Sequence, residues 1–192
     1  MNIMNNTFLN VKDNGGDLAT IVSRELGALN AEKLSTIAAC EEETTDLNMK
    51  LTEHFTLKEF VISATAIRNG LDNTPPAEEV QRLRKLCENV LEPLRMHFGA
   101  IRITSGYRSY RVNELIGGAR TSQHLYGEAA DIHCGSTETG RKYYNFILEN
   151  LDFDQLLLEF SSGKHPHIHC LHVSFRSDRG KNRKRCSSYY PV

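Results

Sequence analysis

The stretch SQHLYGEAADIH, residues 122–133, is the part of the sequence that limits the possible fold most strongly, because it places a polar turn directly before a strand-like run. Gly127 can turn the chain, and the residues after it have the short, apolar-rich pattern of a strand. In such a strand Asp131 and His133 share one face, and His124 lies on the loop that leads into it. An imidazole and a carboxylate separated by one tight turn can therefore converge on a single point.

Two helices are predicted ahead of this turn. In LTEHFTLKEFVIS, Thr56 can act as an N-cap with Glu59 as its capping-box partner, so a short helix begins there. In residues 73–99, Thr74 can cap a longer helix that carries two prolines at its start and ends at Gly99. Apolar residues recur at helical spacing along this helix and form one stripe: Val80, Leu83, Leu86, Cys87, Val90, Leu91 and Leu94.

The chain after residue 100 is rich in strand signals. AIRITSGYRS alternates in polarity and predicts a strand that ends at the turn Ser105-Gly106, whereas residues 113–127 predict a loop. Residues 140–151 predict a helix, and residues 153–160 and 169–175 predict two strands joined by the polar loop SSGKHPHI. We therefore expect an α+β fold in which an antiparallel sheet of a few strands packs against two or three helices.

Composition limits the domain organisation and the partners. A chain of 192 residues with 40% apolar residues can bury a real core. Its character changes near residue 50: we expect residues 1–50 to be an N-terminal extension of unknown role, with an amphipathic helix in residues 17–39, and residues 51–192 to form the main domain. With 23 Lys and Arg against 24 Asp and Glu, the chain has no overall field that would gather nucleic acid.

Other global features predict a protein made in the cytoplasm without a signal peptide and without membrane insertion, and we expect a monomer. The N-terminus lacks a basic start followed by an apolar run, and no window reaches membrane-spanning length. Five widely spaced cysteines with no CxxC pair argue against a disulfide framework and against a thiolate metal site. The basic run RSDRGKNRKR, residues 176–185, is interpreted as a solvated edge, with contact to an anionic polymer as the alternative.

Histidine and carboxylate together suit Zn²⁺, and His124 with Asp131 would leave room for a third ligand and a water. The third ligand is expected from the segment HPHIHCLHVSF, which holds four histidines in eight residues. His172 stands apart because it lies within a strand-like run, where a ligand is better fixed than on a loop. The alternative interpretation is that His165, His167 and His169 form a flexible tract that binds metal only adventitiously.

Several motifs together resemble the zinc D-Ala-D-Ala carboxypeptidases and the phage L-alanyl-D-glutamate endolysins, which are peptidoglycan metallopeptidases. SQHLYGEAAD fits their pattern Ser-x-His-x-x-Gly-x-Ala-x-Asp. Five other motifs of the chain also stand in the order in which the family has them: LTEHFTLKEF, VLEPLR, ITSGYRS and VNELIGGA before this pattern, and HVSF after it. The resemblance covers about residues 51–176 and leaves residues 1–50 outside it.

The resemblance implies roles for five residues. His124, Asp131 and His172 match the zinc ligands, and Arg108 matches an arginine that faces the substrate and the developing oxyanion. The alternative for Arg108 is a buried pair with a carboxylate, because a guanidinium fork serves both purposes. Ser122 matches a position at the edge of the site, where it can bind substrate or brace the loop.

The general base is where this sequence departs from the family pattern. Many relatives carry a carboxylate three residues before the final histidine, and here that position is His169. Glu159, on the adjoining apolar run, can serve instead if its strand lies beside that of His172, and His169 can itself act as a base. A third possibility is that no base is present and the protein binds zinc and ligand without turnover.

The resemblance thus implies a zinc-dependent hydrolase of peptide bonds in bacterial cell-wall peptides, of either the D-Ala-D-Ala carboxypeptidase or the L-Ala-D-Glu endopeptidase type. The alternatives are a catalytically silent, zinc-containing peptidoglycan-binding module and a metal-free structural domain. Because the sequence shows no export signal, we expect action at the cell wall or periplasm only after release from the cytoplasm, as for a phage lysis enzyme.

Overall fold

The computed structural model describes residues 46–189. The amphipathic helix expected in residues 17–39 lies outside the described residues, and the domain boundary near residue 50 stays a prediction. Within residues 46–189 no helix is long and apolar enough to cross a membrane.

The first described helices begin where their capping residues predict. Helix α2 (Leu57–Val61) starts after Thr56, whose backbone N–H donates to Glu59 Oε1 at 2.8 Å. This confirms the capping box. Helix α3 (Ala64–Arg68) follows at once and is capped by Ser63 Oγ, which accepts from the N–H of Ala66.

The long helix predicted in residues 73–99 is present, but it starts later and contains one irregular turn. Helix α4 (Ala77–Leu86) begins after Pro76 and not at a Thr74 cap, because a residue directly before a proline is disfavoured in helical conformation. A π-helical turn (Cys87–Leu91) then leads into helix α5 (Glu92–Phe98). We attribute the wide turn to Pro93, which lacks an N–H and whose ring would meet the carbonyl four residues earlier.

The C-terminal end and the buried face of this helix agree with the sequence. Gly99 ends it with φ 82°, and its N–H donates to Arg95 O at 2.8 Å. The predicted apolar stripe is buried along its whole length: Val80, Leu83, Leu86, Cys87, Val90, Leu91 and Leu94.

A five-stranded sheet in the order β1-β2-β4-β3-β5 forms the centre of the fold. Its strands are β1 (Ile103–Ser105), β2 (Ala129–His133), β3 (Gln155–Phe160), β4 (Ile168–Ser174) and β5 (Arg185–Tyr189). The first four pair antiparallel, whereas β5 pairs parallel to β3. The predicted α+β class is therefore confirmed, with a sheet that is mostly but not wholly antiparallel.

Strand β5 begins at Arg185, the last residue of the basic run 176–185 for which the charge pattern predicts a solvated edge. Its residues, RCSSY, have no alternation of apolar and polar side chains, so the periodicity carried no strand signal. The strand forms because β3 would otherwise leave its outer row of backbone groups unpaired.

Two further elements differ from the predictions. Residues 113–127, expected to be a loop, begin inside helix α6 (Tyr110–Leu115) and end in a 3₁₀ turn (Gln123–Tyr126). Both pieces are too short for periodicity to reveal them. Helix α7 (Thr137–Asn150) starts earlier than expected, because Ser136 Oγ caps it by accepting from the N–H of Thr139 at 3.0 Å.

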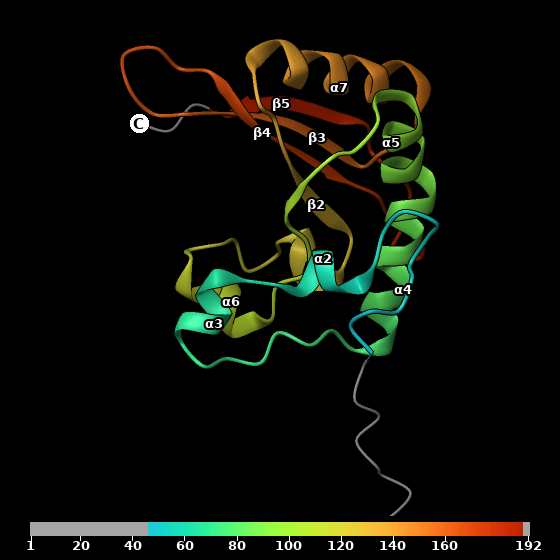
Figure 1. Cartoon of the computed structure of the whole chain (residues 1–192), viewed down its shortest axis with the longest axis vertical. Helices are drawn as coiled ribbons and strands as arrows, with labels where there is room; N and C mark the ends of the chain where they lie inside the picture. The colour runs from blue at the N-terminus through green and yellow to red at the C-terminus, as the bar shows by residue number, and fades with distance from the viewer. Residues whose placement is uncertain (1–45, 190–192) are drawn as a thin grey trace, which may run out of the picture. The chain divides into compact units, whose positions relative to one another are not determined.

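The sheet has one face in the core and one face turned away from it. Alternate residues of the central strands, Ala130 and Ile132 on β2 and Leu171 and Val173 on β4, are fully buried and belong to the core that includes Ile147 of α7. Helix α7 packs along β3 and β4 and lies at the top of the view in Figure 1. Helices α3 and α6 lie side by side at the lower left of the same view. The residues between them in the strands face the opposite side, where the candidate site lies.

Candidate metal centre

Two candidate ligands come from neighbouring central strands. Strands β2 and β4 pair so that Asp131 lies directly opposite His172, and Leu157 of β3 lies opposite His172 on its other side. Directly opposed residues of an antiparallel pair share one face of the sheet. The three side chains therefore form a row across the face that does not contact the core.

The third candidate ligand, His124, reaches this row from the 3₁₀ turn before β2. Gly127 ends the turn in the left-handed conformation, with φ 66°. A Cβ on Gly127 would lie 2.4 Å from the carbonyl oxygen of Glu79, so only glycine fits here. The sharp reversal at Gly127 lets the turn fold back over the strand that it precedes.

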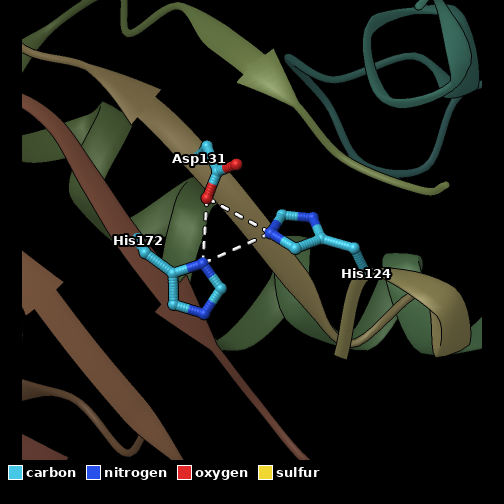
Figure 2. A group of neighbouring side chains, drawn as sticks. All are labelled: His124, Asp131 and His172. Atoms are coloured by element: carbon cyan, nitrogen blue, oxygen red, sulfur yellow. Dashed lines mark hydrogen bonds and ion pairs between the residues drawn. The ribbon is translucent and has the colours of Figure 1, made fainter. Parts of the chain in front are cut away.

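The three side chains present one atom each to a common point (Figure 2). His172 Nδ1 lies 2.9 Å from Asp131 Oδ1, and His124 Nε2 lies 3.2 Å from the same oxygen and 3.3 Å from His172 Nδ1. Ligands about 2.0–2.1 Å from a tetrahedral zinc ion stand roughly 3.3 Å apart. The triangle thus matches one face of such a coordination shell.

Hydrogen bonding on the far side of His124 decides which ring nitrogen faces the cluster. His124 Nδ1 lies 2.6 Å from Gly106 O, and a carbonyl oxygen can only accept, so Nδ1 carries the proton. Burial lowers the pKa of His124, which keeps the ring neutral and leaves a lone pair on Nε2. Such a backbone partner is typical of a histidine that binds metal.

The carboxylate of the cluster is held in its charged form. Burial alone would raise the pKa of Asp131, but the carboxylate also accepts a hydrogen bond from the guanidinium of Arg108 at 2.6 Å, and its pKa lies below its usual range. A charged carboxylate and the lone pair of His124 therefore converge on one point, where a cation is the natural partner.

Arg108 contacts the other carboxylate oxygen. Its Nη2 donates to Asp131 Oδ2 at 2.6 Å, and its Nε donates to Ser105 Oγ at 2.9 Å. The pair with a carboxylate, which the sequence left as the alternative, is therefore present. Arg108 also lines the cavity in front of the cluster, so its guanidinium is within reach of a bound molecule as well.

A cavity of about 500 Å³ opens over the cluster. Three of its walls come from separate parts of the chain: the turn that carries His124, the loop after α6, and strand β3. Its lining residues are Arg108, Gly117, Ala119, Ser122, His124, Asp131, Gln155, Leu157, Glu159 and His172. The structure thus brings Ser122 and Arg108 to the same cavity as the three candidate ligands.

The two candidate bases differ in their placement. Glu159 lines the cavity from β3, the strand beside that of His172. It lies opposite Cys170, two residues along β3 from Leu157, and so shares a face of the sheet with Leu157 and His172. Burial, followed by the charge of Asp131, raises its pKa. His169 is exposed and is not among the lining residues of this cavity, although its carbonyl oxygen accepts from the N–H of Cys134.

Sequence reasoning did not single out Gln155 and Leu157, which line the cavity beside Glu159. All three alternate along β3 and so share one face. The period of two in QLLLEF was the available signal, but only the pairing of β3 with β4 shows which face meets the site. The loop histidines His165 and His167 are exposed and take no part in the cluster.

A buried polar network braces the turn that carries His124. Gln123 Oε1 accepts from Ser174 Oγ at 2.8 Å, and the same hydroxyl accepts from the N–H of Gln155 at 3.0 Å. From the basic C-terminal segment, the guanidinium of Arg179 stacks on the ring of Tyr126 at 3.4 Å. The turn is thus tied to β3, β4 and the C-terminal segment at once.

A second group of possible ligands, Glu53, His54 and Glu92, lies outside this cavity. It is largely exposed, and the carboxylate of Glu92 is already engaged by His54 and by Thr52 Oγ1. Such groups are common on protein surfaces without a metal.

Fold and site together define a candidate metal-binding domain with an open cavity over the cluster. The chain belongs to the peptidase M15 family, whose model matches residues 53–170. This confirms the family resemblance that the motifs indicated. The match includes His124 and Asp131 and ends two residues before His172. No curated protein matches the chain.

Proposed function

We propose that the protein is a zinc peptidase that cleaves peptide bonds in bacterial cell-wall peptides, of the D-Ala-D-Ala or the L-Ala-D-Glu type. His124, Asp131 and His172 would hold the metal. The observation that carries this proposal is the triangle of 2.9–3.3 Å between their facing atoms, together with the Nδ1–H of His124 being held by Gly106 O. Zn²⁺ bound there would acidify water and polarise the scissile carbonyl.

Glu159 is proposed as the general base. From β3 it would take a proton from the attacking water and pass it to the leaving amine. Its raised pKa, caused mainly by burial, suits a group that must both accept and return a proton. His169 stays the alternative base, because it occupies the position at which many relatives carry a carboxylate.

Arg108 and Ser122 are proposed to bind the substrate. The guanidinium of Arg108, fixed by Asp131 and Ser105, would stabilise the negative charge that develops on the carbonyl oxygen. Ser122, at the edge of the cavity, would hydrogen-bond the peptide or hold the loop beside it.

The deciding experiment measures zinc per chain and amine release from muropeptides for the wild type and His172→Ala. We expect one zinc per wild-type chain after dialysis at low free zinc, clear amine release, and loss of both in the variant. Equal zinc content in the two proteins would contradict the ligand assignment. The low free zinc concentration keeps the exposed loop histidines from binding metal and obscuring the result.

A second candidate function is a zinc-containing peptidoglycan-binding module without turnover. The observation that favours it is His169 in place of the carboxylate usual at that position. Binding of muropeptides by the zinc-loaded protein, with no amine released over long incubation, would support this module over the peptidase.

A further inference from the structure

A smaller polar pocket of about 180 Å³ adjoins the cavity of the candidate metal centre. It lies at the end of α6 and along the loop that follows, and Gly117 lines both spaces. Ala119, which lines the larger cavity, lies between Gly118 and Arg120, which line the smaller one. A ligand in the larger cavity can therefore extend into the smaller one around this loop.

The charges of the two spaces leave one cation open to a ligand. In the larger cavity Arg108 is engaged by Asp131 and Ser105. In the smaller pocket Glu114 is paired with Arg111 Nη1 at 2.9 Å. Arg120 is exposed and has no ion pair or side-chain hydrogen bond with any residue between 46 and 189.

The loop that carries Arg120 is held rigidly from below by Asn113, which is only 2% exposed. The side-chain Nδ2 of Asn113 donates to Ala119 O at 3.0 Å, and the backbone carbonyl oxygen of Asn113 accepts from the N–H of Gly118 at 2.8 Å. A Cβ on Gly118 would lie 2.2 Å from Asn113 Oδ1, so the loop and the side chain are in close contact. The backbone of this loop is therefore pre-organised.

Asn113 braces the pocket and does not offer an atom to a ligand. Its Oδ1 has no hydrogen-bond donor within the part of the chain that the structure describes, but this oxygen is buried and lies against the backbone of Gly118. The guanidinium of Arg120 is therefore the charged group that this pocket presents to a ligand, and a carboxylate is the partner that a guanidinium fork binds best.

We propose that this pocket is a carboxylate subsite, in which Arg120 binds a free carboxylate of the substrate. The inference rests on the proposed peptidase function and names a substrate feature. Cell-wall peptides offer two such carboxylates close to a scissile bond: the α-carboxylate of γ-linked D-glutamate and the C-terminal carboxylate of D-Ala-D-Ala. Both present the same chemistry to a guanidinium.

Calorimetric titration of the zinc-loaded full chain with two matched peptide pairs tests the subsite. One pair is L-alanyl-γ-D-glutamyl-L-lysine with its α-carboxyl free or amidated. The other is acetyl-L-lysyl-D-alanyl-D-alanine with its C-terminal carboxyl free or amidated. We expect the wild type to bind the acid of one pair more tightly than the amide, and Arg120→Ala to weaken binding of that acid alone by about 3- to 10-fold. The pair affected identifies the source of the carboxylate.

Two further variants separate the subsite from general surface charge. Arg120→Lys should keep part of the preference for the acid, because the charge remains and the planar fork is lost. Arg141→Ala removes an exposed arginine of α7 and should change neither affinity. Zinc content should be the same in all four proteins, and the preference for the acid should fall as ionic strength rises.

Three results would overturn the subsite: no measurable binding of any peptide, equal affinity of the wild type for acid and amide in both pairs, or an undiminished preference in Arg120→Ala. Amine release is followed in the same samples. Loss of the acid preference in Arg120→Ala without any hydrolysis by the wild type would support the subsite while contradicting the peptidase function.

Discussion

At the scale of single residues, hydrogen bonds made away from the cluster orient the atoms that face it. Gly106 O fixes the tautomer of His124, and Arg108 holds the outer oxygen of Asp131. Such partners align ligands before a metal binds and so raise affinity. The same logic makes Glu159 and Arg108 the residues whose replacement is most informative.

Replacing the proposed base tests Glu159. Glu159→Gln keeps the shape and a hydrogen-bonding group but removes the basicity, so hydrolysis should fall by about 10²- to 10⁴-fold with zinc still bound. His169→Ala serves as the matched variant and should have a much smaller effect. The measurement is kcat/KM on muropeptides together with zinc content, and the reverse ranking would transfer the role to His169.

The pH dependence of activity gives an independent test of the same residue. A base must be deprotonated to act, so kcat/KM should fall as the pH drops through the pKa of Glu159. Because burial and the charge of Asp131 raise that pKa, the acid limb should lie above the ordinary value for glutamate, about 4.3. An acid limb that is the same in wild type and Glu159→Gln would contradict the assignment.

Arg108→Ala separates a role in the transition state from a role in folding. If the guanidinium stabilises charge that appears only in the transition state, kcat should fall by about 10²-fold or more with normal zinc content. The measurements are kcat, zinc per chain and the thermal unfolding midpoint. A collapse of the midpoint, with zinc lost as well, would show that the pair with Asp131 is its main role.

At the scale of elements, the 3₁₀ turn and strand β3 bring the cavity walls together. The turn places His124 over β2, and its reversal depends on Gly127, whose neighbour is the backbone of α4. Strand β3 presents Gln155, Leu157 and Glu159 to the cavity because β4 pairs with it on one side and β5 on the other.

Gly127→Ala should damage both stability and the metal centre. The new methyl group would meet Glu79 O at 2.4 Å in a left-handed backbone, so we expect a loss of about 2–4 kcal/mol in the free energy of unfolding and weaker zinc binding. Gly70→Ala is the matched control, because Gly70 has φ 59° and no atom within 4 Å of the added carbon. It should cost only about 1 kcal/mol and leave zinc affinity unchanged. Denaturant unfolding and zinc titration of both variants test this, and equal effects would contradict it.

At the scale of the whole molecule, the C-terminal segment closes the fold through buried charge. Asp154 is fully buried, and its carboxylate accepts from Arg183 Nε at 2.8 Å and from the backbone N–H of Arg183 at 3.0 Å. Arg176 Nε lies 3.3 Å from the same carboxylate. Two arginines of the basic run, Arg176 and Arg183, are thus paired with this carboxylate, whereas residues 177–181 and 183–185 are exposed, which agrees with the interpretation of the run as a solvated edge.

Asp154→Asn should destabilise the protein by about 1–3 kcal/mol near neutral pH, because the charge-assisted bonds to Arg183 are lost. Burial alone would raise the pKa of Asp154, but the hydrogen bonds from Arg183 outweigh it and lower the pKa. A carboxyl group with a lowered pKa in the folded state stabilises the protein above its unfolded pKa of about 3.9, and this contribution is lost as the pH falls further. The difference between wild type and variant should thus shrink below about pH 4 in denaturant unfolding, and a difference independent of pH would contradict this account.

By itself the sequence determined most of the local structure and the chemistry available to it. The capping box at Thr56, the stop at Gly99, the strands around Asp131 and His172 and the α+β class all follow from signals a few residues long. Motif order was also enough to indicate the peptidase M15 family. What these signals share is that each depends on neighbours along the chain.

Only the tertiary structure decided which of these residues meet. Alternation assigns residues to two faces of a strand, but the register between strands sets which side chains lie opposite, and here it places Asp131 against His172 and turns Glu159 into the cavity. The parallel pairing of β5 has the same origin, since nothing in RCSSY signals a strand until β3 offers an open edge. Contacts distant in sequence are fixed by packing, and local periodicity carries no information about them.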